Sequence, residues 1–188
     1  MTVTAETSWA LARLARLVAT PQPDLVELFR SLEPPSLSEA DGEFAGYLPV
    51  RGLSDDKLAV VDAMYSGELP AGLWLGKAFI GTTDARSEGY NMWRTPEGAV
   101  KRSLRFTTFV GESAIDGKPS LVMNYCDFAN EAAAIGLVDE VRKVEDGVYI
   151  GAGLTAEERE AGVVSGCFLL AGPVHPSTVV DDPDAERK

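Results

Sequence analysis

The stretch Gly72-Leu73-Trp74-Leu75-Gly76-Lys77-Ala78-Phe79-Ile80-Gly81 decides how the rest of the sequence is interpreted. Trp74 stands between Gly72 and Gly76, and an apolar run leads on to Gly81. Glycine inside a strand usually marks a bulge, a bend or the close approach of another backbone. A large aromatic between two such points suits a strand that turns sharply at the bottom of a curved sheet, although large aromatics also serve plain core packing. We therefore interpret the stretch as the first strand of a barrel, with Trp74 as a plug that closes one end and contacts no ligand.

The segments after residue 72 alternate between apolar and polar residues with the period that is typical of strands. Asp116-Gly117 and Asp146-Gly147 are strong hairpin signals between these segments. No strand–helix–strand spacing interrupts them, so the sequence predicts a mainly β fold, an antiparallel barrel or a strongly curved sheet. Strands are expected at residues 73–80, 89–94, 99–111, 120–127, 137–144, 148–152 and 165–171.

Amphipathic helices are predicted ahead of the strands. One covers residues 7–19, a second begins after Asp24, and a third begins after Ser54 and ends at Gly67. The apolar stripe of the first two must dock on the barrel or on a second copy of the chain in a homodimer, and docking within the chain is expected. The predicted organisation is an N-terminal helical arm at 1–35, an antiparallel β-barrel domain with one inserted helix at 36–175, and an acidic disordered tail at 176–188.

The composition restricts the classes of partner. The 188 residues include 17 Lys and Arg against 29 Asp and Glu, a formal net charge of −12, which argues against binding to nucleic acid or to an anionic membrane. No apolar run is long enough to span a membrane, and the N-terminus has no signal-peptide pattern. Two cysteines do not form a secreted disulfide framework, so a cytoplasmic protein is expected.

The segment Gly42-Glu43-Phe44-Ala45-Gly46 repeats the glycine–aromatic–glycine pattern around Trp74. Together with residues 28–36 and the charged run at 139–147, the two patterns resemble the GXWXG family of bacterial proteins, in which a short N-terminal region precedes a domain of unassigned function. Phe44 departs from the tryptophan of the family motif. The resemblance implies a lipocalin-like barrel that holds a small, mostly apolar metabolite, and it transfers no catalytic residue.

The cluster Asn124-Tyr125-Cys126-Asp127 is the first candidate for chemistry. On a strand, Tyr125 and Asp127 share one face and Asn124 shares the other with Cys126. A tyrosine and a carboxylate in an apolar cavity can polarise a carbonyl and move a proton, since burial raises the pKa of the carboxylate. The alternative is that Asp127 ends the strand in solvent, as most aspartates do.

The run Asp139-Glu140-Val141-Arg142 is the second candidate. Glu140 and Arg142 share one strand face, where an ion pair inside the barrel can orient the polar end of a ligand. The alternative is a solvated ladder of charges outside the barrel. The residues expected to act as acid or base are Tyr125, Asp127 and Glu140, and those expected to bind the ligand are Tyr90, Asn91, Trp93, Arg102, Asn124 and Arg142.

Three functions compete. The first is a cofactor-independent cyclase or isomerase of an apolar polyketide-like or terpenoid compound of secondary metabolism, which works by orienting its substrate. The second is a carrier that binds such a compound without chemistry. The third is a haem-binding barrel that uses His175, the single histidine. Metal-binding and nucleotide-binding motifs are absent from the sequence, so neither a metal nor a cofactor is predicted.

Overall fold

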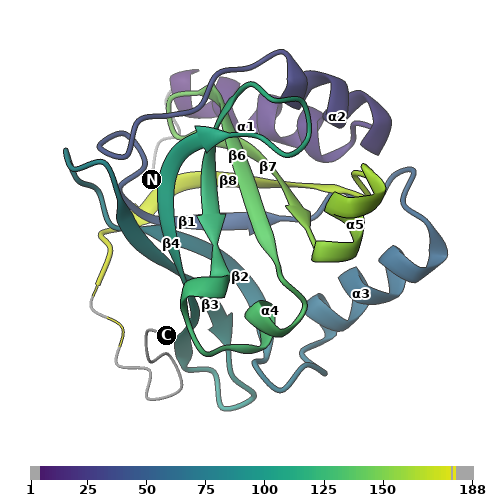
Figure 1. Ribbon diagram of the computed structural model, residues 1–188, viewed down its shortest axis with the longest axis vertical. Helices are drawn as coiled ribbons and strands as arrows, with labels where there is room; N and C mark the ends of the chain where they lie inside the picture. The colour runs from purple at the N-terminus through teal and green to yellow at the C-terminus, as the bar shows by residue number, and fades with distance from the viewer. Residues whose placement is uncertain (1–4, 179, 181–188) are drawn as a thin grey trace.

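The computed structural model describes residues 5–178 and 180, and eight strands in this part of the chain close into an antiparallel barrel (Figure 1). Each strand pairs with its neighbours along the chain, and the last strand pairs with the first. The predicted antiparallel barrel is therefore confirmed. The strands are β1 (Gly42–Tyr47), β2 (Leu73–Phe79), β3 (Ser87–Arg94), β4 (Val100–Glu112), β5 (Pro119–Asn124), β6 (Val138–Glu145), β7 (Val148–Leu154) and β8 (Cys167–His175).

The helices lie outside the barrel (Figure 1). The one inserted helix that the sequence predicts is α3 (Asp55–Ser66). The described barrel segment contains, in addition, two short α-helices and a 3₁₀ turn. Within the described residues, no helix combines the length and the hydrophobicity that a bilayer crossing requires. The helical elements are α1 (Ala5–Val18), α2 (Gln22–Arg30), α3 (Asp55–Ser66), the 3₁₀ turn η1 (Tyr125–Asp127), α4 (Glu131–Ala134) and α5 (Ala156–Ala161).

Strands β1 and β2 approach so closely that only glycine fits at their contact. Gly76 has a φ of 140°, and a Cβ there would overlap the carbonyl oxygen of Phe44. The pairing of β2 with β3 also shifts register between Trp74 and Gly76, which is a β-bulge. Trp74 and Lys77 are three residues apart, yet both face the interior because of this extra residue.

A row of aromatic rings fills the part of the interior that is solid. Phe44 packs edge-on against Phe79 with the ring centroids 5.9 Å apart, and Phe79 packs in the same way against Phe106, also at 5.9 Å. Phe106 continues the row to Tyr125 at 5.2 Å. The indole of Trp74 belongs to the same buried cluster and also lines a cavity, so the prediction that it lies away from any ligand space is wrong.

A second irregularity reverses the faces of β4. Leu104 has a φ of 53°, unusual for a residue other than glycine, and the pairing of β3 with β4 shifts register beside it. Phe106 therefore faces the interior, whereas Arg102 pairs with Met92 on the outer face. The expectation that Arg102 binds a ligand inside the barrel assumed an unbroken alternation along this strand, and the position of Arg102 on the outer face contradicts it.

The N-terminal helices dock on the barrel of their own chain. Leu25 and Phe29 of α2 are fully buried against Ile150 of β7 and Leu169 of β8. In Figure 1, α1 and α2 lie together at one end of the barrel. Docking within the chain is thus what the structure shows, and the homodimer stays a prediction.

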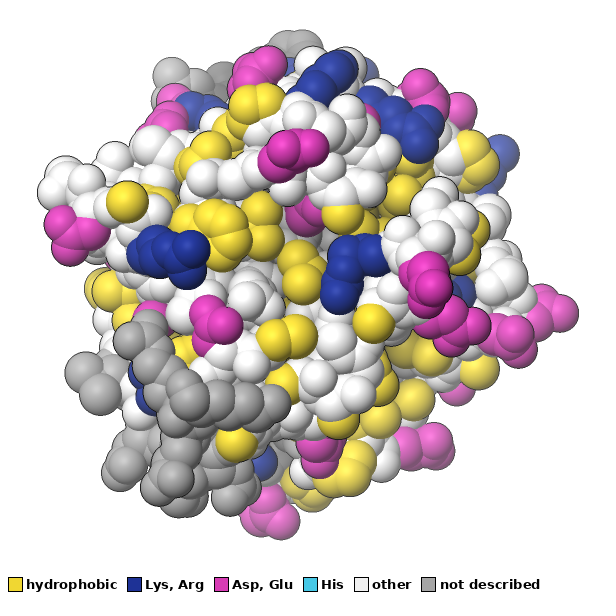
Figure 2. Space-filling view, viewed as in Figure 1, with side chains coloured by type: hydrophobic (Ala, Val, Ile, Leu, Met, Phe, Trp, Pro, Cys, Tyr) yellow, Lys and Arg dark blue, Asp and Glu magenta, His cyan; other side chains and the backbone are white. Residues whose placement is uncertain are grey.

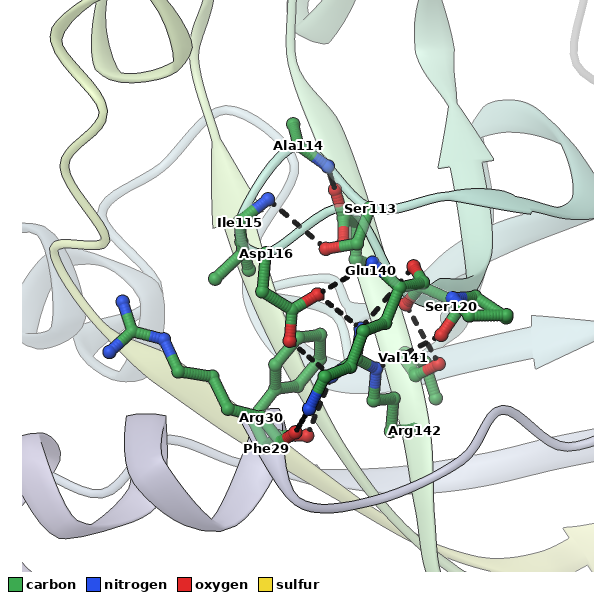
Figure 3. Close-up of polar contacts among 12 residues, drawn as sticks. Phe29, Arg30, Ser113, Ala114, Ile115, Asp116, Ser120, Glu140, Val141 and Arg142 are labelled. Atoms are coloured by element: carbon green, nitrogen blue, oxygen red, sulfur yellow. Dashed lines mark hydrogen bonds and ion pairs between the residues drawn. The ribbon is translucent and has the colours of Figure 1, made fainter.

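Arg142 fastens this helical arm to the barrel (Figure 3). Its fully buried guanidinium donates two hydrogen bonds to the carboxylate of Asp116, at 2.8 and 2.6 Å, and one to the carbonyl of Phe29 at 3.0 Å. The same guanidinium lies 4.5 Å from the centroid of the Phe29 ring. One side chain of β6 therefore joins α2 to the loop between β4 and β5.

The predicted acidic tail is described at residues 176–178 and 180 only, and the rest of it lies outside the described residues. The amide of Thr178 donates to the hydroxyl of Tyr90 at 2.9 Å, and Val180 packs on the cluster formed by Ala78, Tyr90 and Met92. The described part of this segment thus follows the outer face of the barrel instead of being disordered.

The close contact between β1 and Trp74 gives a first prediction. A Cβ at Gly46 would overlap the Trp74 indole. We expect Gly46→Ala to lower the free energy of unfolding by about 1–3 kcal/mol, measured by urea denaturation, because overpacking strains the neighbouring side chains. In a Trp74→Leu background the same change should cost less but not nothing, because the Cα of Gly76 would still lie 2.8 Å from the new Cβ. Equal costs in the two backgrounds would contradict the clash with the indole.

The ion pair of Arg142 and Asp116, which joins the helical arm to the barrel, gives a prediction about the pH dependence of stability. The hydrogen bonds from Arg142 hold the pKa of Asp116 at about 2, below its ordinary value of 3.8. The contribution of this carboxylate to stability is therefore complete above pH 3.8 and is lost as the pH falls through about 2. We expect Asp116→Asn to cost about 3 kcal/mol at neutral pH, because it removes one partner of a buried charge.

The pH series provides the check on this prediction. Urea denaturation should show the gap between wild type and Asp116→Asn shrinking as the pH is lowered from 4 towards 2. Asp146→Asn, which alters an ion pair on the exposed surface, should change stability little at any pH and serves as the control. A gap that does not depend on pH would rule out the ion pair as its cause.

Candidate functional site

A cavity of about 420 Å³ occupies part of the barrel interior and opens beside α3 and α5. Its size falls in the range of small-molecule sites, and its wall is mostly apolar. Val61 and Met64 of α3, Leu104 of β4 and Phe168 of β8 are among the apolar residues of the wall. The cavity is therefore suited to a ligand that is largely apolar.

The mouth of the cavity has an apolar rim with one ion pair. Val60 of α3 and Ile135, which follows α4, line the cavity and are also exposed. Lys57 of α3 donates to Glu158 of α5 at 2.7 Å and so joins the two helices across the rim. Figure 2 shows hydrophobic side chains at the lower right of the visible face, over α3 and α4.

Four polar residues form the floor of the cavity, and Lys77 is at their centre. Its ammonium lies 2.7 Å from Oδ2 of Asp139, 2.7 Å from the hydroxyl of Tyr125 and 2.9 Å from Oδ1 of Asn91. Only 5% of Lys77 and 3% of Asp139 is exposed, so this ion pair is shielded from bulk water. The floor is a buried, electrically balanced cluster beneath apolar walls.

Further hydrogen bonds close this cluster into a network. The hydroxyl of Tyr125 donates to Oδ2 of Asp139 at 2.9 Å and accepts from Nδ2 of Asn91 at 3.0 Å. The indole N–H of Trp74 donates to Oδ1 of Asn91 at 3.1 Å. Burial and, after it, the charge of Asp139 raise the pKa of Tyr125 well above its ordinary value, so the phenol keeps its proton at neutral pH.

Local features of the chain bring these residues together. Lys77 on β2 and Asn91 on β3 are direct partners in the ladder. Asn124 ends β5 because its side chain accepts the amide of Cys126, and the 3₁₀ turn after it sends Tyr125 into the interior. Asp139 on β6 pairs with a glycine of β7, which leaves room for its carboxylate.

Burying this cluster costs the folded protein free energy, and stability alone does not explain it. Two charges taken out of water lose hydration, and replacing a buried ion pair with apolar residues is often neutral or stabilising. An aromatic ring offsets part of the cost, since the ammonium of Lys77 lies 5.2 Å from the centroid of Phe168. An ion pair at the end of an apolar cavity is therefore more typical of a functional site than of a packed core.

Three residues predicted to form the site do line the cavity. Asn91 and Trp93 of β3 face the interior, and Tyr125 is part of the floor. The indole N–H of Trp93 is buried and makes no hydrogen bond with the described residues. The sequence left open which face of β3 points inward, and the structure decides for Asn91 and Trp93.

Glu140 and Arg142 lie outside the barrel, Glu140 beneath the loop between β4 and β5 and Arg142 beneath the helical arm (Figure 3). Glu140 accepts the amide of Ala114 at 2.7 Å, and burial raises the pKa of its carboxyl group. The prediction that this pair binds or transforms a ligand inside the barrel is wrong, because the register of β6 turns Asp139 inward and its neighbours outward.

Tyr90 and Arg102 are also on the outer surface of the barrel. Both donate to Oε1 of Glu43, at 2.9 and 2.6 Å. Tyr90 is fully buried there because the segment that includes Thr178 covers it. Neither residue lines the cavity, so their expected role in binding a ligand inside it is wrong.

Asn124 and Asp127 form a separate cluster with Thr107. Asp127 accepts from the hydroxyl of Thr107 at 2.6 Å and from Nδ2 of Asn124 at 3.1 Å. The predicted strand at 120–127 stops at Asn124, so Tyr125 and Asp127 do not share a strand face. Asp127 lies away from the cavity, which excludes it as the acid or base there.

His175 is exposed at the end of β8 and lies away from the cavity wall. Across the described residues, no group of three or more His, Cys, Asp or Glu side chains could hold a metal ion. The haem hypothesis required this histidine to reach the interior, and its position speaks against that arrangement.

Among the cavity residues that the sequence prediction missed as site residues are Lys77, Asp139 and Trp74. A lysine inside the apolar run of β2 was a usable signal, since a charge in a barrel strand must face water or a buried partner. The alternation of β6 likewise placed Asp139 on the face of the core residue Val141.

Comparisons with known proteins support the fold. No family model matches the chain, and no curated protein does, so the resemblance to the GXWXG family stays a prediction. A crystal structure of a protein from Thermomonospora curvata is similar to this chain with a TM-score of 0.58 and 23% sequence identity. The match covers 85% of this chain and 95% of that one, and it shows that the two share the barrel fold.

Proposed function

We propose that this barrel encloses a small, mostly apolar metabolite and catalyses a cofactor-independent cyclisation or isomerisation of it. The single observation that carries this proposal is the ion pair of Lys77 and Asp139, with Tyr125 hydrogen-bonded to both, at the floor of an apolar cavity. The apolar wall provides shape and excludes water, and the floor provides proton donors and a carboxylate.

The acid–base groups proposed here differ from those expected from the sequence. Asp139 and Lys77 take the places that were assigned to Asp127 and Glu140, and Tyr125 remains. Trp93, whose indole N–H has no partner among the described residues, adds a hydrogen-bond donor to the cavity wall, and Asn91 holds Lys77 and Tyr125 in place. Cys126 and Cys167 form no disulfide, which supports the proposed cytoplasmic location.

The second candidate function is a carrier without chemistry. Lys77 favours it, because its three ammonium hydrogens already have acceptors within the floor cluster. In that case the floor residues hydrogen-bond only to one another, and a ligand above them contacts mainly apolar surface. The two functions share the cavity and differ in whether the ligand leaves it chemically changed.

Native mass spectrometry of the protein from its own host tests occupancy of the cavity. We expect a bound small molecule that is lost when Val61→Trp fills the cavity with an indole. Val110→Trp, an equal change at an exposed site on β4 outside the cavity lining, should keep the ligand. Returning the extracted compound to ligand-free protein should convert it, and its quantitative recovery unchanged would favour the carrier.

A double substitution separates function from stability. We expect Lys77→Met with Asp139→Leu to keep the free energy of unfolding within about 2 kcal/mol of wild type, since apolar residues replace both charges. Either substitution alone should cost about 3–5 kcal/mol, because one buried charge loses its partner. Urea denaturation measures all three variants, and a double variant as unstable as the single ones would mark the pair as structural.

A further inference from the structure

The two oxygens of Asp139 have different surroundings. The contacts with Lys77 and with Tyr125 both end on Oδ2, at 2.7 and 2.9 Å. Oδ1 points towards Gly153 of β7, where a Cβ would lie 2.7 Å from it. Asp139 and Gly153 both line the cavity, so the missing side chain of Gly153 leaves a space beside Oδ1.

In this geometry one oxygen of the Asp139 carboxylate, Oδ2, is hydrogen-bonded within the protein, and the other, Oδ1, faces the cavity. The contacts on Oδ2 fix the orientation of the carboxylate, and Oδ1 is the oxygen available to accept a proton from a molecule in the cavity. Gly153 adopts no left-handed backbone conformation, so the close approach of the carboxylate is what requires glycine there.

A hydrogen-bond donor is also available beside this base. Oδ1 of Asn91 accepts from both Lys77 and Trp74, so it stays paired through the Trp74 indole if Lys77 turns one N–H into the cavity. Lys77 then keeps its contacts with Asp139 and Tyr125. An oxygen bound by this N–H lies next to the carboxylate, so base and donor can act on adjacent atoms of one ligand.

The charge of the cluster selects the kind of ligand. The ammonium of Lys77 and the carboxylate of Asp139 cancel, and the wall above them is mostly apolar. A carboxylate ligand would gain no uncompensated cation and would meet the charge of Asp139. A neutral carbonyl oxygen needs only a hydrogen bond, so a ketone or an ester fits the floor better than an acid.

Resting on the proposed function, we propose that the reaction is proton abstraction next to the carbonyl of a neutral apolar ketone or ester, with Oδ1 of Asp139 as the base. The C–H bond breaks and its proton passes to Oδ1, while its electron pair forms the C=C bond of an enolate. The carbonyl π pair moves onto the oxygen, which accepts the Lys77 N–H. Return of the proton to a conjugated carbon completes an isomerisation and restores the carboxylate.

Deuterium exchange into β-ionone tests this step. This apolar ketone carries exchangeable hydrogens beside its carbonyl, and its alcohol β-ionol has the same skeleton but cannot enolise. In D₂O we expect the wild type to exchange these hydrogens about 100-fold faster than Asp139→Asn, the usual scale of general base catalysis, measured by NMR. Binding of both compounds is followed by displacement of the fluorescent probe phenylnaphthylamine.

A pair of glycine variants keeps the test independent of the charge at Asp139. Gly153→Ala places a methyl group against Oδ1 and should slow exchange at least 10-fold, while β-ionol still binds. Gly111→Ala adds the same methyl group on β4 away from the cavity, where the nearest atom is in the Phe109 ring at 2.8 Å, and should leave exchange unchanged.

Each outcome separates this inference from the function on which it rests. Binding of both compounds without exchange above the buffer rate would overturn proton abstraction and leave the binding function standing. Exchange that survives in both Asp139→Asn and Gly153→Ala would overturn the role of Oδ1. If neither compound displaces the fluorescent probe from the cavity, the proposed function fails together with the inference.

Discussion

The buried contact between the ammonium of Lys77 and the carboxylate of Asp139 is the interaction on which the interior of this barrel depends. It joins β2 to β6, and the hydrogen bonds of Lys77 extend it to Asn91 on β3 and Tyr125 of η1. A lysine can lie so deep only when each of its donors has an acceptor and its charge has a partner. The cavity, its polar floor and the chemistry proposed for it all depend on that requirement.

The other buried charges of the barrel serve its outer surface. Arg142 and Asp116 hold the helical arm, and Glu43 binds Arg102 and Tyr90 beneath the segment after β8. These contacts lie between a strand and the element that covers it, whereas the Lys77 cluster lies among strands with a cavity above it. The same kinds of side chain are thus structural on one face of the sheet and available to a ligand on the other.

The fold was largely predictable, and the site was predictable only in part. Alternating segments and hairpin signals indicated an antiparallel barrel, because turn type and the alternation of buried and exposed residues both depend on residues that are close in the sequence. The same alternation misplaced Arg102 and Asp127. A bulge at Leu104 and the side-chain hydrogen bond of Asn124 each change the direction in which the neighbouring side chains point, and neither irregularity has a signature in the alternation itself.

By itself, the sequence determined the barrel class, the N-terminal helices, and the presence of glycines around Trp74, since each of these depends on local propensity and spacing. Only the tertiary structure decided which face of β6, that of Asp139 or that of Glu140, points into the barrel, and that Trp74 borders the cavity. The physical reason is that alternation separates the two faces of a strand without showing which one is inside, and the pairing with the neighbouring strands decides it. At Trp74 and Leu104, one extra residue also exchanges the inner and outer faces of the strand.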